Sequence, residues 1–226
     1  MRKSAIFSKY ENDSPESIEF RRINAKIKNL NTACQTTKIL ITSSIAGEGK
    51  STISTLLAIT FSRHSPGDTL LVDCDLRRPK IHKILGIEKQ NGLAETLQGD
   101  ATPLDVIKNT AIKNLKVITS GNLKETPTKL LTLSNIKNIF EKLQPSFEQI
   151  IIDSPPVIPV NDSLILGSVA DTTLLIIKAG KTQKEVTKRA IDLIKDAGIK
   201  TTALLVNNLE NVLPYYYNYN YYKYKY

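Results

Sequence analysis

The chain has 226 residues, of which 41% are hydrophobic and 23% are charged, and its formal net charge is +9 at pH 7. This length can bury the core of one large α/β domain. The only two cysteines, Cys34 and Cys74, argue against a disulfide framework or a thiolate metal site and for a reducing, cytoplasmic environment. No apolar run approaches the roughly 20 residues that span a bilayer, and the first ten residues lack the apolar segment of a signal peptide.

The excess of lysine could indicate binding to nucleic acid or to an anionic membrane. The lysines of the second half of the chain are scattered, however, mostly one per helical turn. This spacing favours solvated helix faces. A general preference for polyanions stays open, but no specific nucleic-acid partner is predicted.

The first 36 residues are predicted to be an extension that carries one helix. Residues 1–13 are polar, and a helix is expected from Ser14, which can cap it, to residue 30. Pro15 suits the first turn, and an approximate apolar stripe follows, formed by Ile18, Ile23, Ile27 and Leu30. The other face is basic. The helix could dock on a neighbouring subunit or pack against its own domain, and the residues alone leave both readings open.

A phosphate-binding loop is predicted within residues 38–55, KILITSSIAGEGKSTIST. A hydrophobic strand over residues 39–41 leads into a turn of small residues and glycine, and a helix follows over residues 50–63. In this context the backbone N–H groups of residues 46–51 can surround a polyphosphate at the positive end of the helix. The predicted nucleotide contacts are Ser44, Ala46, Gly47, Glu48, Gly49, Lys50, Ser51 and Thr52.

Two side chains of this loop have separate expected tasks. The Lys50 ammonium would reach the β- and γ-phosphates of ATP, and the Ser51 hydroxyl would ligate Mg²⁺. Ser44 stands where the motif usually has its first glycine, five positions before Gly49. Serine is small and suits turns, so we expect the loop to be retained.

Carboxylates follow two further apolar runs. A strand predicted over residues 69–72 runs into Asp73 and Asp75, and a strand over residues 149–153 ends at Asp153, before Ser-Pro-Pro. Parallel strands bind ligands at their carboxyl ends, and a buried charge there is costly unless it faces a metal or a phosphate. Asp75 and Asp153 are therefore candidate Mg²⁺ ligands together with Ser51, and Asp153 matches the second acidic element of P-loop NTPases, the Walker B motif.

The rest of the chain alternates helices and strands. Helices are expected over residues 80–85, 128–143, 161–170 and 184–197, with short ones within 91–107, and strands over residues 115–118, 172–177 and 201–206. This alternation predicts an α/β P-loop NTPase domain over residues 37–210, with a doubly wound, mostly parallel sheet and helices on both faces. Asn207 follows the last strand, where it could read the adenine edge or serve as a turn residue.

Residues 211–226 are predicted to be a disordered, tyrosine-rich tail, because they lack apolar periodicity and capping signals. Aggregation, or stacking of interleaved tyrosine and lysine on nucleic acid, is one reading of this composition. Phosphate acceptance is the other. At about 3.3 Å per residue the tyrosines reach roughly 25–60 Å from the last strand, far enough to enter a neighbouring subunit. The candidate acceptors are Tyr215, Tyr216, Tyr217, Tyr219, Tyr221, Tyr222, Tyr224 and Tyr226.

Nearly the whole chain resembles the bacterial tyrosine kinases of capsular and exopolysaccharide synthesis, in their separate cytoplasmic form. The resemblance rests on SSIAGEGKST, on LLVDCDLRRP (the Walker A′ motif), on IIIDSPP and on the terminal tyrosine cluster. It implies ATP and Mg²⁺ as cofactors, with Lys50, Asp73 and Asp75 serving catalysis. Asp73 could accept or orient the proton of a tyrosine hydroxyl, with Asp75 nearer the metal, but the sequence does not fix which aspartate does which.

The resemblance also implies partners and a location. Phosphate would be transferred between the subunits of a ring-shaped homo-oligomer and removed by a cognate tyrosine phosphatase, and other protein substrates are conceivable. A membrane adaptor of the chain-length-regulator type would activate the kinase and recruit it to the inner face of the cell membrane. The family's helical Glu-x-x-Arg-x-x-Arg motif is altered here to Ile18, Arg21 and Asn24. Arg21 and Arg22 are thus the candidate oligomerisation residues that remain.

Two competing readings use the same fold. A partitioning or cell-division ATPase would act as a nucleotide-switched dimer, but it normally carries a signature lysine where this chain has Ile45, and it has no use for the tail. A non-catalytic adaptor would not need the lysine, serine and three aspartates just described. His64 and His82 lie far from any partner motif and are not expected to act as ligands or bases.

Overall fold

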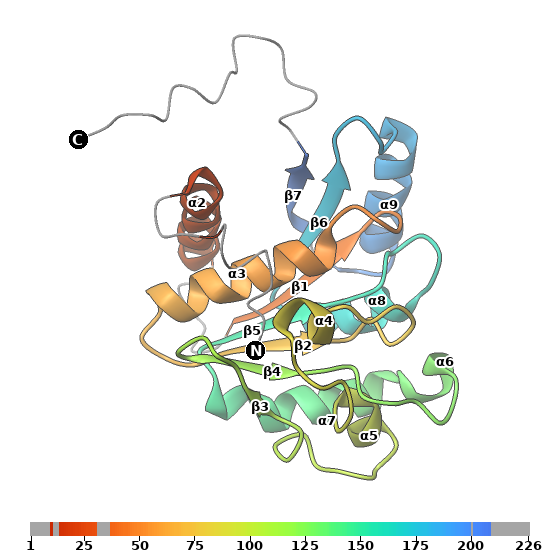
Figure 1. The fold of residues 1–226 in the computed structure, drawn as a ribbon. Coiled ribbons are helices and arrows are strands. Elements are labelled where there is room, and N and C mark those ends of the chain that lie inside the picture. The colour runs from red at the N-terminus through yellow and green to blue at the C-terminus, as the bar shows by residue number, and fades with distance from the viewer. Residues whose placement is uncertain (1–9, 11–13, 31–36, 200, 209–226) are drawn as a thin grey trace, which may run out of the picture.

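The computed structural model describes residue 10 and residues 14–30, 37–199 and 201–208. In these residues seven strands form one sheet, in the order β3-β4-β2-β5-β1-β6-β7 (Figure 1). The strands are β1 (Thr37–Ser43), β2 (Thr69–Asp73), β3 (Lys108–Asn109), β4 (Leu115–Ile118), β5 (Gln149–Asp153), β6 (Thr172–Lys178) and β7 (Thr201–Asn207).

Every neighbouring pair in this sheet is parallel except β3 and β4. The prediction of a doubly wound, mostly parallel sheet is therefore confirmed. The parallel register places Asp73 of β2 directly beside Asp153 of β5, and Ile41 of β1 on the other side of Asp153. Residues that follow different strands in the sequence thus meet at one edge of the sheet.

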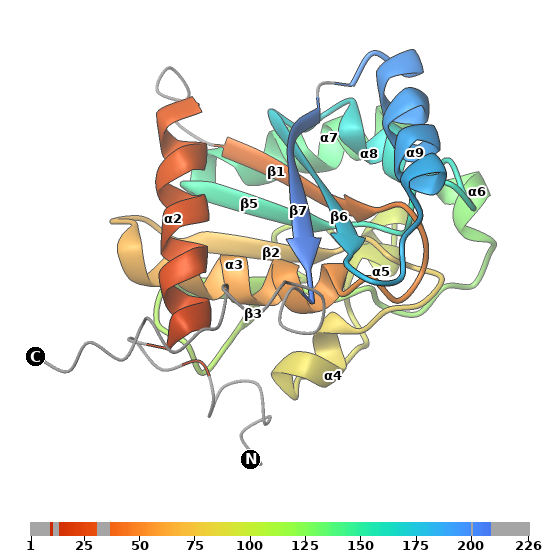
Figure 2. The same cartoon turned by 90° about the horizontal axis from the view of Figure 1, so that it is seen from above.

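Helices cover both faces of the sheet (Figures 1 and 2). They are α2 (Pro15–Leu30), α3 (Lys50–His64), α4 (Ile81–Leu85), α5 (Leu93–Leu97), α6 (Pro127–Leu130), α7 (Leu133–Leu143), α8 (Asp162–Gly167) and α9 (Lys184–Asp196), with a 3₁₀ turn at Gln144–Ser146. The buried strands send alternate side chains to opposite faces. Ile151 packs with α3 and its residue Phe61, whereas Ile150 and Ile152 pack with α7 and its residue Phe140.

The N-terminal helix packs against its own domain. Ile27 is buried, and Phe20 and Ile23 are half-buried in the same cluster as residues of α3. Tyr10 lies edge-on against Phe20 with ring centroids 5.9 Å apart, and its hydroxyl hydrogen-bonds to the Thr60 hydroxyl on α3. The structure thus shows that one face of this helix packs against its own domain. Contact of the helix with a neighbouring subunit stays a prediction.

Two predicted segments differ from the structure. The single helix expected over residues 128–143 is wrong: it is divided between α6 and α7, because Thr132 is extended and its hydroxyl accepts a hydrogen bond from Asn135 N at 3.3 Å, as an N-cap. Within 91–107 only α5 forms, and the short antiparallel strand β3 was not predicted. Two residues carry too little pattern to reveal a strand.

No helix of the described residues is long and apolar enough to cross a membrane. The tail at 211–226, with its eight candidate acceptors, and Cys34 lie outside the described residues.

Candidate nucleotide and phosphoryl-transfer site

The phosphate-binding loop connects β1 to α3, as predicted. Two of its residues have left-handed backbone conformations, Gly47 with φ of +84° and Gly49 with φ of +96°, which side chains rarely allow. Gly49 also has a close neighbour: a Cβ atom there would lie 2.3 Å from Nδ2 of Asn207. Glycine is thus required at Gly49 both by conformation and by space.

Hydrogen bonds hold the phosphate-binding loop in place, both within the loop and to residues near the ends of β6 and β7. Glu48 is fully buried. Its Oε2 accepts a hydrogen bond from Ile45 N at 2.9 Å, and its Oε1 accepts one from the Thr182 hydroxyl. Asn207 donates from Nδ2 to the carbonyl of Glu48 at 2.9 Å. The carboxylate of Glu48 is therefore committed to bracing the loop, a role that the sequence analysis missed.

The Lys50 ammonium forms a buried ion pair with Asp75. Its Nζ lies 2.7 Å from Oδ2 of Asp75, and the side chains are 11% and 4% exposed. Burial by itself lowers the pKa of Lys50, but the carboxylates of Asp153 and Asp75 outweigh it and raise that pKa above its ordinary value. Lys50 therefore stays charged, close to the loop that would hold the phosphates.

Asp73 and Asp153 add two more buried carboxyl groups beside this pair. One oxygen of each, Oδ1 of Asp73 and Oδ2 of Asp153, has no hydrogen-bond partner among the described residues. Burial, with the neighbouring charge of Asp153, raises the pKa of Asp73 well above its usual range. Burial also raises the pKa of Asp153, against the opposing effect of Lys50.

The loop after β2 ties these carboxylates to α4. Oδ2 of Asp73 accepts hydrogen bonds from the backbone N–H groups of Lys80 at 3.2 Å and Ile81 at 3.1 Å. Oδ1 of Asp75 accepts one from Arg78 N at 3.0 Å. The position of α4 is thus set by the same two side chains that line the candidate site.

The site can hold a metal ion if a bound nucleotide supplies some of the ligands. Within the described ranges, no three or more His, Cys, Asp or Glu side chains are placed to hold a metal ion by themselves. Mg²⁺ usually binds through one or two carboxylates, substrate phosphates and water. The unpaired oxygen of Asp153 and the buried Ser51 at the start of α3 suit this arrangement. Asp75, the other predicted ligand, is paired with Lys50.

The other predicted contacts lie along the same loop. Ser44 is buried, and its hydroxyl has no hydrogen-bond partner among the described residues. Ala46 is exposed, Thr52 is half-buried, and the Lys181 ammonium lies 3.4 Å from the carbonyl oxygen of Ala46. Lys181 comes from the β6–α9 loop, which no motif marks.

Supporting residues beside the aspartates were also missed. The hydroxyl of Ser54, one helical turn after Lys50, donates to Oδ1 of Asp153 at 3.0 Å. Arg77 donates from Nε to Oδ2 of Asp162 at 2.8 Å, which joins the loop after β2 to the start of α8. Of these supporting residues, only Ser54 could have been recognised from the sequence, because it lies four residues after Lys50 and such residues share a helix face.

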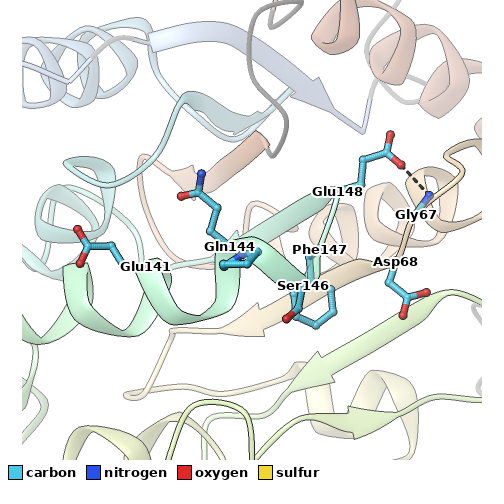
Figure 3. Close-up of a pocket in the computed structure, with 8 residues that line it drawn as sticks. Gly67, Asp68, Glu141, Gln144, Ser146, Phe147 and Glu148 are labelled. Carbon is cyan, nitrogen blue, oxygen red and sulfur yellow. Dashed lines mark hydrogen bonds between the residues drawn. The ribbon is translucent and has the colours of Figure 1, made fainter.

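A hollow of about 550 Å³ lies at the opposite edge of the sheet from the candidate site (Figure 3). It is lined by Asp68 before β2, by Glu141 at the end of α7 and by Glu148 before β5. Oε2 of Glu148 accepts a hydrogen bond from Gly67 N at 2.7 Å. Because this hollow lies at the amino ends of β2 and β5, it contains none of the predicted site residues.

Comparisons with known proteins agree with this geometry. The family model for ParA, described as NUBPL iron-transfer P-loop NTPase, matches residues 35–220. Tyrosine-protein kinase YwqD of Bacillus subtilis is 31% identical over 202 residues, which are 89% of this chain and 85% of that protein. The crystal structure of the chimerical protein CapA2B2 superposes with a TM-score of 0.81 at 31% identity, over 87% of each chain.

A more distant likeness concerns the fold alone. The septum site-determining protein MinD from Pyrococcus horikoshii, complexed with Mg-ADP, has a TM-score of 0.67 at 21% identity, over 80% of this chain and 75% of that one. P-loop NTPases bind a nucleotide together with a divalent metal. The chain belongs to the ParA family of P-loop NTPases and, within it, to the bacterial tyrosine kinases.

Proposed function

We propose that this chain is a protein-tyrosine kinase that transfers the γ-phosphoryl group of ATP to tyrosines in the tail of a neighbouring copy. The observation that carries the proposal is the buried pair of Lys50 and Asp75 at the carboxyl edge of the sheet, with Asp73 and Asp153 beside it. Similarity to tyrosine-protein kinase YwqD supports the choice of tyrosine as acceptor.

ATP would lie with its phosphates in the loop between β1 and α3. The backbone N–H groups of residues 46–51 and the Lys50 ammonium would neutralise the phosphate charge. Asn207 lies against Gly49, and we propose that it also borders the base of the nucleotide. Ser51, Asp75 and Asp153 would hold Mg²⁺, which when bound offsets the negative charge of the phosphates.

A tyrosine hydroxyl has a pKa of about 10, so it needs help to lose its proton during transfer. Asp73 and Asp75 are the candidate groups. Asp73 has one unpaired oxygen and a raised pKa, both of which suit a group that takes up a proton. Asp75 can exchange its contact with Lys50 for the metal once phosphates bind Lys50. We therefore assign the proton to Asp73 and the metal to Asp75.

Phosphorylation would also regulate the assembly. Each phosphotyrosine adds about 1.5 to 2 negative charges. Several phosphotyrosines in one tail would therefore repel one another, and the tail would dissociate from an anion-binding site. We propose a homo-oligomer that disperses as its tails are phosphorylated and re-forms after a phosphatase acts. A membrane adaptor would recruit and activate the kinase at the inner face of the membrane, in support of capsular or exopolysaccharide synthesis and export. Arg21 and Arg22, on α2, are proposed contacts between subunits.

A mixing experiment tests transfer between copies. The donor is the chain shortened before residue 215, and the acceptor is full-length Lys50→Met; neither is expected to phosphorylate itself. Mixed with Mg-ATP, the acceptor should gain phosphate within residues 215–226, as mapped by peptide mass spectrometry. If the acceptor gains no phosphate, while full-length wild type incubated separately at high dilution does, transfer takes place within one chain instead.

A further inference from the structure

A basic hollow opens beside α4, next to the candidate site. We call it the α4 pocket. Its volume is about 650 Å³, within the range of ligand pockets. Four cationic side chains line it, from Arg78, Lys80, Lys83 and Lys89. Figure 2 shows α4 beside the first turns of α3, beyond the sheet edge that carries the site.

The cationic side chains of the α4 pocket are not engaged in ion pairs with the described residues. None of the four cationic side chains forms an ion pair with a carboxylate of the described part of the chain. Burial, Lys83 and Lys89 lower the pKa of His82, which also lines the pocket. Uncompensated cations around a concave surface attract anions, above all phosphate, which arginine and lysine bind through charge-assisted hydrogen bonds.

The pocket is joined to the catalytic carboxylates by short contacts. Arg78, on its wall, donates its backbone N–H to Asp75 at 3.0 Å. Lys80, also on its wall, donates its backbone N–H to Asp73 at 3.2 Å. The α4 pocket therefore adjoins the candidate site, so one extended peptide could contact both.

We propose that the α4 pocket binds a phosphotyrosine side chain already formed in the tail of a neighbouring copy. This rests on the proposed kinase function. The four cations would hold the phosphate, and the half-buried Pro79 and Ile84, which also line the pocket, would contact the aromatic ring. The combination of two apolar and four cationic side chains suits a phosphorylated aromatic side chain better than a free anion.

The composition of the tail makes this recognition conditional. Residues 215–226 contain no acidic residue and carry Lys223 and Lys225, so the unmodified side chains of the tail offer the pocket no negative charge. The first phosphate changes that, since it adds about 1.5 to 2 negative charges. Binding it in the α4 pocket would keep the tail at the site and present the next tyrosine to Asp73. Later phosphates would then be added faster than the first, until several of them in one tail repel one another and the tail dissociates.

Binding is measured without ATP, so that the result does not depend on kinase activity. The protein is the phosphatase-treated full chain, and the probe is a fluorescent peptide of residues 214–226 with phosphate on Tyr221. Fluorescence anisotropy should show binding of this peptide at least about tenfold tighter than of the unphosphorylated peptide. The variant Lys83→Gln/Lys89→Gln should lose about tenfold in affinity. Lys188→Gln/Lys195→Gln, which removes the same charge from exposed positions on α9, should bind like wild type.

Three results would overturn the proposal. One is equal binding of both peptides. The second is displacement of the peptide by inorganic phosphate as readily as by free phosphotyrosine, because the pocket would then recognise an anion only. The third is loss of binding to phosphatidylserine vesicles in Lys83→Gln/Lys89→Gln with no change toward the peptide, which would make the surface a membrane contact. Thermal unfolding of each variant separates these results from misfolding.

Discussion

The Lys50 ammonium lies 2.7 Å from a carboxylate oxygen of Asp75, and both side chains are buried. The cation expected to bind the β- and γ-phosphates is thus held in place by the carboxylate expected to help bind the metal. When ATP and Mg²⁺ bind, each partner would find a new counter-charge. The pair therefore keeps two costly buried charges compensated until the substrate arrives.

Replacing Lys50 by methionine should affect both stability and activity. Without the cation, the carboxylates of Asp73, Asp75 and Asp153 stand together uncompensated, and we expect a loss of about 3–5 kcal/mol in the free energy of unfolding. Phosphoryl transfer should fall by at least about 10²-fold. Chemical denaturation and phosphate incorporation measure the two effects. Lys188→Met, at an exposed position on α9, is the control, and equal stability of the two variants would contradict the buried pair.

Asp73→Asn should separate stability from activity. The pKa of Asp73 is higher in the folded than in the unfolded state. At a pH above the ordinary carboxyl pKa, ionisation of Asp73 therefore destabilises the fold. This penalty disappears as the pH falls toward the ordinary carboxyl pKa. At pH 7 the variant should be more stable by about 1 kcal/mol and inactive. Its advantage should shrink on acidification. Melting curves across this pH range test the sign, with Asp196→Asn on the exposed end of α9 as the control. If the stability advantage of the variant over wild type is instead larger at acidic pH than at pH 7, the pKa of Asp73 is not raised in the folded state.

Thr182 is predicted to matter through Glu48. Thr182→Val keeps the shape of the side chain but removes the hydroxyl that donates to the buried carboxylate, which should cost about 1–3 kcal/mol. The loosened loop should also bind ADP several-fold more weakly in titration calorimetry. Thr182→Ser, which retains the hydroxyl, is the matched variant. If valine and serine behave alike, Glu48 does not depend on this bond.

Gly49→Ala tests the close approach of β7 to the phosphate loop. The added Cβ would meet Nδ2 of Asn207 at 2.3 Å, and alanine is strained at a φ of +96°. Nucleotide affinity should therefore fall by at least about tenfold. Asn207→Ala removes the clash but leaves the backbone strain, so Gly49→Ala should cost less affinity when it is added to Asn207→Ala than when it is added to the wild type. An equal loss in both backgrounds would assign the whole effect to the backbone.

The sequence predicts the sheet and the centre of the site well because both depend on local patterns. Runs such as residues 150–152 are apolar throughout, as the middle of a fully buried parallel strand is, and the aspartates come where those strands end. Once the strands are parallel, the meeting of Asp73 with Asp153 follows from register alone.

The parts that the sequence did not reveal depend on contacts between distant segments. Thr182 reaches Glu48 across 134 positions, and nothing near Thr182 marks it as a partner of the loop. The break between α6 and α7 likewise results from one side-chain cap at Thr132, within a stretch whose apolar spacing suits a single helix. The α4 pocket appears only when the cations of one short helix and the loops around it are seen together.

Copies of this chain are proposed to phosphorylate one another's tyrosine-rich tails. Intact mass after incubation with Mg-ATP tests this proposal most directly, for the wild type, for Lys50→Met and for the chain without residues 215–226, each with and without the cytoplasmic segment of a candidate adaptor. Phosphorylation of the tail should give a ladder of steps of about 80 Da, one per phosphate, in the wild type alone. ATP hydrolysis without any ladder, even with the adaptor segment, would contradict it and favour a nucleotide switch.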